Sequence, residues 1–580
     1  MATNGGHTDD FTRRRFLQTA AVGAGLLWSP VRRLTRLDAV AGPAPDGFPS
    51  GIELYKQFYE NWALEIRADD VWTASPRNEQ DVVTLANWAV QHGWRLRPSG
   101  ARHGWAPFTV TPGQSKDARI ILVDTREHLT KITLGPPGKG RTVTAQAGAT
   151  MDDLMQVLHD AGRGFSSIPA PGDVTVAGVL AVNAHGAAIP AAGEKTRGRS
   201  FGSMSNRVVS LDAVVWDNAT NAFVLRSFDR SQPITKALLT NLGRIFVTSA
   251  TLRTEKNVNM RCVSYVDITA AELFSAPSNQ GPRSFANFVE QAGRVEAIWF
   301  PTTTKPWLKV WSVQRRRPAA SRQVTAGYNY PFSDNVPEPV ARMARAIVAS
   351  HPESTPTFGA TMYNASVQGL RACDAYDIWG SAKNTQHYIK ATTLRAAEFG
   401  YGVLTSRANI QRALHEFVTK YEELVATYKA RGQYPSNMPL EIRCTGVDRA
   451  QDVGVPGAEP PALSGMSPRA DHPEWDTVIW LNALTLVGTN GVFGFKHELE
   501  QWMLSNYSGD YATARVEWSK GWAYTTEGGW IDPTVVDDAI PNGFRAARTP
   551  ENNWDWTIAR FNELDPHRVF GNAFLDALLR

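Results

Sequence analysis

Cysteine is scarce in this chain. Its 580 residues contain only Cys262, Cys373 and Cys444, and no two of them form a C-x-x-C pair. That spacing argues against a zinc knuckle, an iron–sulfur centre, a covalently attached haem and a fold held together by disulfides. We therefore predict that the protein holds no metal and that a hydrophobic core stabilises it.

A large excess of one charge is also missing. The 60 Lys and Arg residues nearly balance the 56 Asp and Glu residues, which leaves a formal charge of +4. No long basic run occurs, so nucleic acid is not expected as a partner. A hydrophobic content of 43% is typical of globular proteins, and the length of the chain predicts two or three domains.

Several common nucleotide and protease motifs are absent. Residues 138–141 fail the P-loop pattern at its essential positions, and no convincing G-x-G-x-x-G follows a predicted strand. His415-Glu416 and His497-Glu498 both lack the second histidine of H-E-x-x-H. These absences weigh against an ATPase, a nicotinamide-dependent dehydrogenase and a zinc protease.

The N-terminus has the order of an export signal. A twin-arginine pattern at residues 12–18 precedes an apolar run at 20–28, and Ala39-Val40-Ala41 offers an A-x-A cleavage site. The run is far shorter than the roughly 20 residues that span a membrane. We predict that residues 1–41 are a twin-arginine signal peptide and that the protein is secreted or periplasmic. A basic tail without this function is the alternative.

The rest of the chain divides by its pattern of strands and helices. Residues 42–258 alternate short strands with amphipathic helices, the first of which is predicted to begin at Ser75-Pro76 and end at Gly93. Thr150 and Asp153 predict a capping box at the start of a later helix.

Longer strands are predicted between residues 259 and 540. They lie at 295–300, 307–314, 440–445 and 478–484. The Pro- and Gly-rich segment 451–475 is predicted to be a surface loop, and residues 541–580 to be an ordered segment that returns to the first domain. The chain as a whole is predicted to have an α+β fold.

The first domain contains a series of loops rich in small residues. They lie at residues 97–107, 147–150, 169–178, 184–186, 200–202 and 243–248. Glycine lets a backbone approach a ligand closely, and successive N–H groups or a helix N-terminus bind phosphate. The first loop adds His103, a nucleophilic nitrogen beside such a cradle. Each loop alone is more often an ordinary turn, but the set favours a dinucleotide site.

The order of these loops resembles the FAD-binding domain of the vanillyl-alcohol oxidase family of flavoproteins. Members carry a histidine loop, a "v-G-a" loop, a "G-x-x-x-T-v-G-G" loop with a trailing "h-G", and an "f-G-i-i-T" strand. Here His103, Gly148, residues 172–178 with His185-Gly186, and residues 245–248 match these motifs in order. The resemblance implies a two-subdomain FAD-binding domain of the PCMH type. It also implies a substrate domain with a mainly antiparallel sheet covered by helices.

The resemblance further implies which residues bind FAD. They are Pro98, Ser99, Gly100, Ala101, Arg102, His103, Gly104, Gly148, Pro171, Gly172, Asp173, Val174, Thr175, Gly178, Val179, His185, Gly186, Phe246 and Val247. In many members the loop histidine is bonded to the flavin 8α-methyl group, so His103 is the expected covalent anchor. No cysteine lies near Asp173, where doubly linked members have one, which implies a single bond. Arg102 and Ala177 depart from the family, since each stands where members have glycine.

Four polar residues stand on predicted strands of the second domain. Alternation in 440–445 puts Glu441 and Arg443 on one face, about 6–7 Å apart, so that they either face one pocket or form an exposed salt bridge of little energetic value. Glu296 is either a buried carboxylate or an edge residue with its head in water. Asn482 lies in an apolar strand and needs a ligand or a protein group as its partner.

These residues sharpen the resemblance to the bacterial cholesterol oxidases with covalent flavin, the type II group. His103-Gly104-Trp105, Glu441-Ile442-Arg443 and Asn482 carry it. It implies a catalytic set of Glu296, Glu398, Glu441, Arg443 and Asn482. Glu441 or Glu296 would accept the hydroxyl proton of the substrate, and Arg443 would offset negative charge.

The implied activity is oxidation of the 3β-hydroxyl of cholesterol with dioxygen, followed by isomerisation to cholest-4-en-3-one. The implied partners are a sterol, dioxygen and, transiently, a membrane surface. One alternative is a sugar or alditol oxidase of the same superfamily, which the 19 Trp residues would suit by stacking on sugars. A second is a non-catalytic flavoprotein that binds a steroid or terpenoid.

Overall fold

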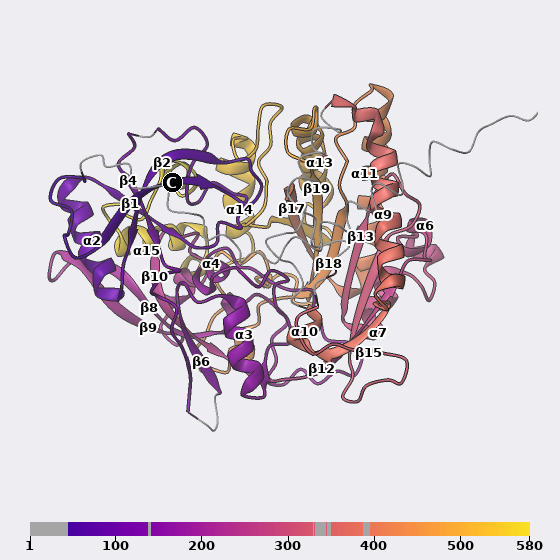
Figure 1. The fold of residues 1–580 in the computed structure, drawn as a ribbon, viewed down its shortest axis with the longest axis horizontal. Coiled ribbons are helices and arrows are strands. Elements are labelled where there is room, and N and C mark those ends of the chain that lie inside the picture. Colours follow the sequence, from indigo (N-terminus) through magenta and orange to yellow (C-terminus); the bar gives the residue numbers. More distant parts are fainter. Residues whose placement is uncertain are drawn as a thin grey trace, which may run out of the picture.

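The computed structural model describes residues 44–580 except 116, 137–140, 329, 331–343, 345–349 and 387–394. The predicted signal peptide at residues 1–41 lies outside this range. Figure 1 shows two halves side by side, with the N-terminal part of the chain in one and the pink-to-orange middle part in the other. Among the described residues, no helix has the length and apolarity needed to cross a bilayer.

The first sheet of the N-terminal half carries the histidine loop at the end of a strand. Its strand order is β1 (Glu53–Glu60), β2 (Arg67–Ser75), β4 (Ile120–Asp124) and β3 (Arg95–Ser99). β1 and β2 are antiparallel, whereas β2 and β3 each run parallel to β4. Because residue 100 follows β3 directly, the loop begins at the edge of a buried sheet.

The helix between β2 and β3 begins later than predicted. α2 spans Glu79–His92 and ends at Gly93 as expected, but its N-cap is Asn78, whose side chain accepts the Asp81 N–H at 3.0 Å. The prediction of Ser75 as the cap was wrong. Ser75 is the last residue of β2, its hydroxyl donates to Glu127 at 2.9 Å, and the following proline favours extended backbone before it.

The second sheet of this half is antiparallel. Its order is β5 (Ile132–Leu134), β6 (Thr142–Gln146), β10 (Phe246–Arg253), β8 (Val208–Asp217) and β9 (Ala222–Asp229). α3 (Met151–Asp160) and α4 (Val176–Ala181) follow two of the small-residue loops, α5 is Thr235–Leu238, and β7 (Arg163–Gly164) pairs with β11 (Glu255–Lys256). The Thr150 hydroxyl accepts the Asp153 N–H at 3.1 Å, which confirms the predicted cap.

A nine-stranded sheet forms the second half. Its order is β15 (Arg322–Gln323), β16 (Asp377–Ser381), β12 (Asn259–Tyr265), β14 (Trp307–Val313), β13 (Arg294–Trp299), β18 (Leu440–Gly446), β19 (Thr477–Thr485), β17 (Ala397–Thr405) and β20 (Ala512–Val516). All neighbours are antiparallel except β15 and β16. The predicted α+β class, with a mainly antiparallel sheet in the second domain, is confirmed.

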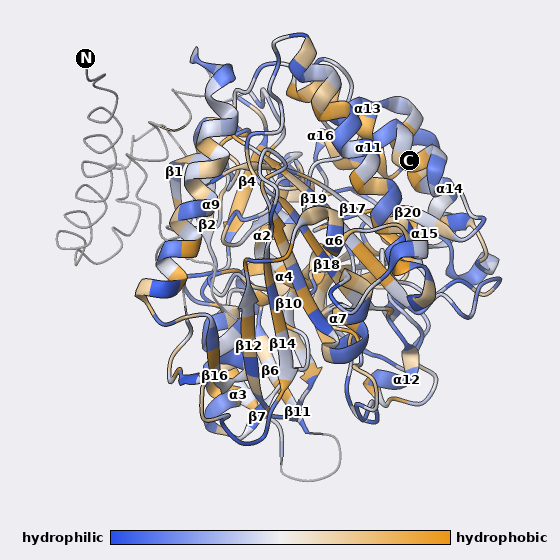
Figure 2. Cartoon of the chain, turned by 90° about the vertical axis from the view of Figure 1, so that its right-hand side faces the viewer, coloured by the Kyte–Doolittle hydropathy of each residue, from blue (hydrophilic) through white to orange (hydrophobic). Residues whose placement is uncertain are grey.

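Helices cover the outer side of this sheet (Figure 1). They are α6 (Ala270–Leu273), α7 (Phe285–Ala292), α9 (Thr355–Ala372), α11 (Ile410–Ala430) and α13 (Val492–Asn506). The short helices α10 (Ala382–Gln386) and α12 (Ala450–Val453) lie instead toward the N-terminal half, α10 beside α3 and α12 beside residues 205–207. Figure 2 shows hydrophobic colour on the central strands and hydrophilic colour on the exposed sides of α9, α11 and α13. That distribution places the core between the sheet and its helices.

The prediction that segment 451–475 lies on the surface was wrong for its middle part. Residues 461–467 are buried. Their polar groups have protein partners, because the Ser464 hydroxyl lies 2.6 Å from Asp448 and 2.9 Å from Asn183, and the Leu463 carbonyl accepts the Trp518 indole N–H at 2.7 Å. A loop can be buried when its backbone is satisfied in this way.

The C-terminal segment packs against the first sheet. It contains α14 (Ile540–Arg545), α15 (Trp554–Leu564) and α16 (Ala573–Leu578). The Leu96 N–H donates to the Val569 carbonyl at 2.8 Å, and the buried Asp565 carboxylate pairs with the buried Arg244 guanidinium. Asp565 also accepts the Val569 N–H at 2.9 Å.

We predict that Asp565→Ala lowers the free energy of unfolding by about 3–5 kcal/mol, because it leaves the buried Arg244 charge without its carboxylate. Chemical denaturation of the full chain measures this difference. Asp555→Ala is the matched control, since Asp555 pairs with Arg545 at 2.7 Å on the surface and should change stability by about 0–1 kcal/mol. Equal losses in the two variants would contradict the prediction.

Candidate active site

A cavity of about 290 Å³ lies where the two halves meet. One side is formed by the loops of the N-terminal half, at residues 97–106, 169–179 and 181–185. The other side carries charged residues of the second half, namely Glu398, Glu441, Arg443, Glu517 and Lys520. Small-residue loops and titratable groups from two domains therefore share one cavity, which is the usual place for a ligand site.

The loop side offers a cradle for an anionic group. Within the described residues, the backbone N–H groups of 100–104 donate no hydrogen bond, and the buried Ser99 hydroxyl has no partner. Gly100 packs so closely on Thr175 that a Cβ at this position would collide with the threonine hydroxyl. Successive N–H donors without partners, beside a glycine at close approach, fit the pyrophosphate of a dinucleotide such as FAD.

Most of the residues predicted to bind FAD line this cavity. They are Pro98, Ser99, Gly100, Ala101, Arg102, His103, Gly104, Pro171, Val174, Thr175, Gly178, Val179, His185 and Val247. Gly148, Gly172, Asp173, Gly186 and Phe246 do not line it. A Cβ at Gly148 would collide with the Thr125 carbonyl, and one at Gly186 with the backbone of Ile168. These two glycines therefore allow close chain packing behind the cavity wall.

His103 lies between two indole rings. Trp62 stacks on it with ring centroids 4.3 Å apart, and Trp105 meets it edge-on at 5.6 Å. Burial lowers the pKa of His103 to about 3, and the cationic side chains of Lys520 and Arg395 add to the shift. The imidazole is therefore neutral at physiological pH and keeps a nitrogen lone pair.

The strand order of the nine-stranded sheet gathers the predicted catalytic residues. β13, β18, β19 and β17 are successive neighbours, and they carry Glu296, Glu441 with Arg443, Asn482 and Glu398 in that order. Glu296 is the register partner of Arg443, and Glu441 that of Asn482. Residues up to 186 positions apart in the sequence (296 and 482) thus meet on four adjacent strands.

The Arg443 guanidinium is the centre of this group. It lies 3.0 Å from Glu441, 3.5 Å from Glu296 and 3.8 Å from Glu398, and it donates to the Asn482 side-chain oxygen at 2.9 Å. Burial lowers the pKa of Arg443, but the surrounding carboxylates, Glu441 foremost, outweigh burial and hold it above its usual value. The alternative of an exposed salt-bridge strand is wrong, since both Glu441 and Arg443 are largely buried.

A second chain of contacts leads from Arg443 to His185. The Asn482 amide donates to Glu517 at 2.7 Å, and the other Glu517 oxygen lies 3.5 Å from the His185 ring. His185 stacks on Trp480 with ring centroids 3.9 Å apart. Asn482 therefore has protein partners on both sides and holds Arg443 and Glu517 in a fixed relation.

Lys520 connects the carboxylates to the histidine loop. Its ammonium group donates to Glu398 at 2.5 Å and lies 3.9 Å from the centroid of the Trp105 ring. This approach depends on Gly400 in β17, because a Cβ at that position would collide with Lys520 and Asn482. Charged residues of the substrate side thus reach the aromatic neighbours of His103.

Two of the carboxylates in the cavity have very different acidities. Burial raises the pKa of Glu441 to about 7, and the nearby Glu398 and Glu296 charges oppose Arg443. Burial raises the pKa of Glu517, but the His185 ring 3.5 Å away and the Lys520 charge outweigh burial and lower it to about 2. At neutral pH Glu517 is an anion, whereas Glu441 readily gains and loses a proton, as a general base does.

Sequence reasoning did not identify Glu517 and Lys520. They follow β20, which joins the sheet at its edge beside β17, and no local motif marks them. The only signal was two opposite charges three residues apart, a spacing that is common on protein surfaces. Glu296 and Asn482, by contrast, contact the group but do not line the cavity.

Two solved structures resemble this chain closely. The chain is similar to a solvent-stable cholesterol oxidase, with 46% identity and a TM-score of 0.91 over 93% of this chain and 100% of that one. It is also similar to cholesterol oxidase from Brevibacterium sterolicum, with 47% identity and a TM-score of 0.90 over 93% of this chain and 100% of that one.

Curated relatives match at lower identity. D-arabinono-1,4-lactone oxidase of Kluyveromyces lactis is 21% identical over 40% of this chain and 39% of its own length. L-gulonolactone oxidase 3 of Arabidopsis thaliana is 24% identical over 34% of this chain and 33% of its own length. The chain therefore spans less than half the length of these curated relatives.

Two protein families match the chain. An FAD binding domain family matches residues 72–218, and the family described as "Cholesterol oxidase, substrate-binding" matches residues 259–580. These matches confirm the resemblance predicted from the loops and strands. Because the second match covers more than half of the chain, and solved members align with 93% of it, the chain belongs to the cholesterol oxidase family of FAD-binding proteins.

Proposed function

We propose that the protein is an FAD-dependent oxidase of the 3β-hydroxyl of cholesterol or a related sterol, with dioxygen as the final electron acceptor and hydrogen peroxide as a product. The observation that carries this proposal is the single cavity shared by the backbone cradle of residues 100–104 and the charged group around Arg443. Family membership supplies the substrate class, since the similar solved structures are cholesterol oxidases.

The residues present have distinct tasks in this reaction. Residues 99–104 hold FAD, which when bound supplies the acceptor for the hydrogen on the substrate carbinol carbon. Glu441 accepts the proton of the substrate hydroxyl, because it lines the cavity and its pKa of about 7 suits a base at neutral pH. Arg443 then offsets the negative charge that develops on the substrate oxygen.

Glu296 is a weaker candidate for this base. It is buried behind Arg443, does not line the cavity and lies 3.6 Å from the Lys309 ammonium group. Glu517 is a poor base because a carboxylate with a pKa of about 2 binds a proton only weakly at neutral pH. Isomerisation of the 5-en-3-one to the 4-en-3-one also requires a carboxylate in the cavity, and we assign it to Glu441 or Glu398 as part of the proposal.

Three further features complete the proposed function. His103 bonds covalently to the flavin, because its neutral ring lies on the cavity beside the cradle.

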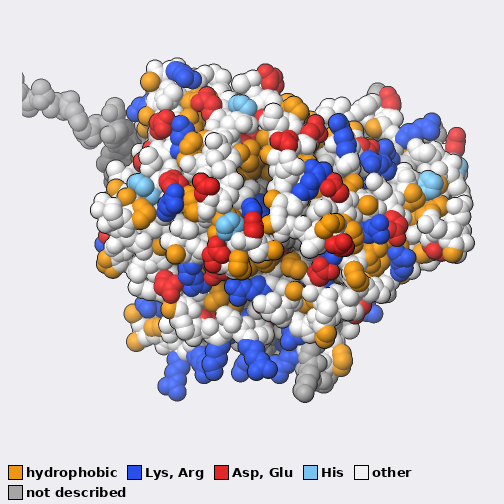
Figure 3. Space-filling model, turned by 180° about the vertical axis from the view of Figure 1, so that it is seen from behind, with side chains coloured by type: hydrophobic (Ala, Val, Ile, Leu, Met, Phe, Trp, Pro, Cys, Tyr) orange, Lys and Arg blue, Asp and Glu red, His pale blue; other side chains and the backbone are white. Residues whose placement is uncertain are grey.

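Export follows the twin-arginine signal expected at residues 1–41. Transient contact with a membrane surface is supported by Lys and Arg side chains that gather along the lower edge in Figure 3, and exposed Arg315, Arg316 and Arg317 lie between β14 and β15.

A sugar-type oxidase is the second candidate, because the curated relatives in the comparison are aldonolactone oxidases. We predict peroxide formation with cholesterol in detergent micelles and none above background with L-gulono-1,4-lactone or xylitol. A coupled peroxidase assay measures it on the flavin-loaded protein. Peroxide from the lactone and none from cholesterol would replace the proposed function with the second candidate.

The raised pKa of Glu441 predicts a pH dependence. Below pH 7 this carboxyl group is protonated and cannot accept a proton, so kcat/KM for cholesterol should rise as the pH increases through about 7. Glu441→Gln should lower kcat/KM by roughly 10²–10⁴ and remove this limb of the profile. Glu423→Gln is the control, since this exposed residue lies on α11 and pairs with Lys420 of the same helix. If kcat/KM of Glu441→Gln still rises with pH through about 7, a group other than Glu441 is the base.

The proposed tether predicts acid-stable flavin. Precipitation of the wild-type protein with acid should leave yellow flavin in the pellet, whereas His103→Ala should release it to the supernatant. Because the backbone cradle remains in the variant, it should still bind FAD before precipitation. Free flavin from the wild-type protein would refute the covalent bond without affecting the proposed sterol oxidation.

A further inference from the structure

The two indole rings beside His103 come from different segments of the chain. Trp62 lies in the turn between β1 and β2 and stacks on the imidazole with an interplanar angle of 26°. Trp105 lies two residues after His103 in the loop and presents its ring at 83° to the imidazole. Together they restrict both the plane and the tilt of the His103 ring.

The residues that lead into β17 bind both indoles. Arg395 donates to the carbonyl of Trp62 at 2.7 Å and to that of Asn61 at 2.6 Å, and its guanidinium lies 5.6 Å from the Trp62 ring centroid. The next residue, Ala396, accepts the Trp105 indole N–H at 2.8 Å. Two consecutive residues of the substrate half thus fix the rings on either side of His103.

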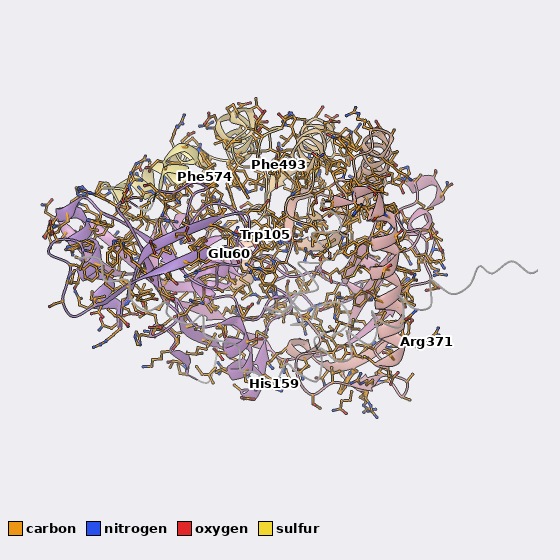
Figure 4. The ribbon with its side chains drawn as sticks, turned by 45° about the horizontal axis from the view of Figure 1, so that its top comes forward. Glu60, Trp105, His159, Arg371, Phe493 and Phe574 are labelled. Atoms are coloured by element: carbon orange, nitrogen blue, oxygen red, sulfur yellow. The ribbon has the colours of Figure 1, made fainter. Side chains whose placement is uncertain are left out.

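This contact lies at the junction of the two halves. Arg395 also pairs with Glu60 at 3.0 Å, and Figure 4 shows Glu60 and Trp105 near each other where the two halves meet. β17 continues from Arg395 and Ala396 to Glu398, which lines the cavity. The same short segment therefore carries a cavity carboxylate and the groups that hold the surroundings of His103.

Arg102, which stands where the family has glycine, belongs to the same arrangement. Its backbone has a φ of 59°, the left-handed conformation that glycine adopts without strain. Its carbonyl accepts the Trp62 N–H at 2.8 Å. Its guanidinium lies 5.0 Å from the Tyr59 ring centroid and donates to the Phe58 carbonyl at 3.2 Å. These contacts to β1 and to the turn that follows it compensate the strain and fix the loop before His103.

We propose that Arg395 and Trp62 are positioning residues that orient the His103 imidazole for its bond to the flavin. The inference rests on the proposed tether and goes beyond it, because it assigns the orientation of the histidine to a residue of the substrate half. The rate at which the His103 ring nitrogen reacts with the flavin 8α carbon depends strongly on how the two atoms are aligned. A misplacement of about 1 Å can lower such a rate on the order of 10²-fold.

The bond itself requires an oxidant. The nitrogen–carbon bond replaces one C–H bond of the flavin 8α-methyl group and the N–H bond of the imidazole. Two electrons and two protons are thereby released, and dioxygen accepts them to form hydrogen peroxide. Arg395 and Trp62 take no part in this transfer and act only on the geometry of His103.

The test measures the rate of covalent bond formation per bound FAD. The full chain is prepared without flavin and mixed with FAD, and acid-stable flavin and total bound FAD are followed over time. Arg395→Gln and Trp62→Leu should bind FAD and form the bond about tenfold to a hundredfold more slowly than the wild type. Trp62→Phe keeps a stacking ring and should stay near the wild-type rate, while Arg395→Lys should lie between.

Arg67→Gln is the matched control. Arg67 pairs with Glu60 at 2.9 Å from the same hairpin, and no contact with either indole is present among the described residues, so this variant should form the bond at the wild-type rate. Wild-type rates in both Arg395→Gln and Trp62→Leu would overturn the positioning role, as would equal slowing in Trp62→Phe and Trp62→Leu. Absence of acid-stable flavin in the wild type would instead refute the tether, and with it this inference, while leaving sterol oxidation intact.

Discussion

A buried arginine surrounded by carboxylates is the constraint around which the substrate half is built. Arg443 lies within 4 Å of Glu441, Glu296 and Glu398, and a buried guanidinium requires opposite charges close by to offset its own. These three carboxylates come from three different strands. The order β13, β18, β19 and β17 brings these strands side by side. Asn482 on β19 links Arg443 to Glu517, because its side chain bonds to both.

The same arrangement separates the properties of chemically identical side chains. Glu517 keeps its charge because His185 and Lys520 stabilise it, whereas burial, aided by the Glu398 and Glu296 charges, raises the pKa of Glu441 to about 7. On the other side of the cavity, burial and two cations keep His103 neutral. A base, a fixed anion and a nucleophilic nitrogen thus coexist in one cavity because each has a different electrostatic environment.

The sequence predicted the parts of this site that have local patterns. The small-residue loops, the Thr150 cap and the alternation of Glu441 with Arg443 depend on short spacings, and the structure places them as those spacings indicate. Glu517 and Lys520 could not be found in this way, because their contacts arise from the pairing of β17 with β20. The sequence also left Arg102 unexplained, since its compensation comes from Tyr59 and Phe58, more than 40 positions away. The burial of residues 461–467 depends likewise on distant partners.

The most direct test of the central role of Arg443 is the pH dependence of anaerobic flavin reduction by cholesterol. The flavin of the wild-type protein should lose its yellow colour, at a rate that rises as the pH increases through about 7. In Arg443→Gln the charge that lowers the pKa of Glu441 is lost, so the reduction should be slower and its limb should move to higher pH. If the rate of flavin reduction in Arg443→Gln is unchanged and rises at the same pH as in the wild type, the account is contradicted.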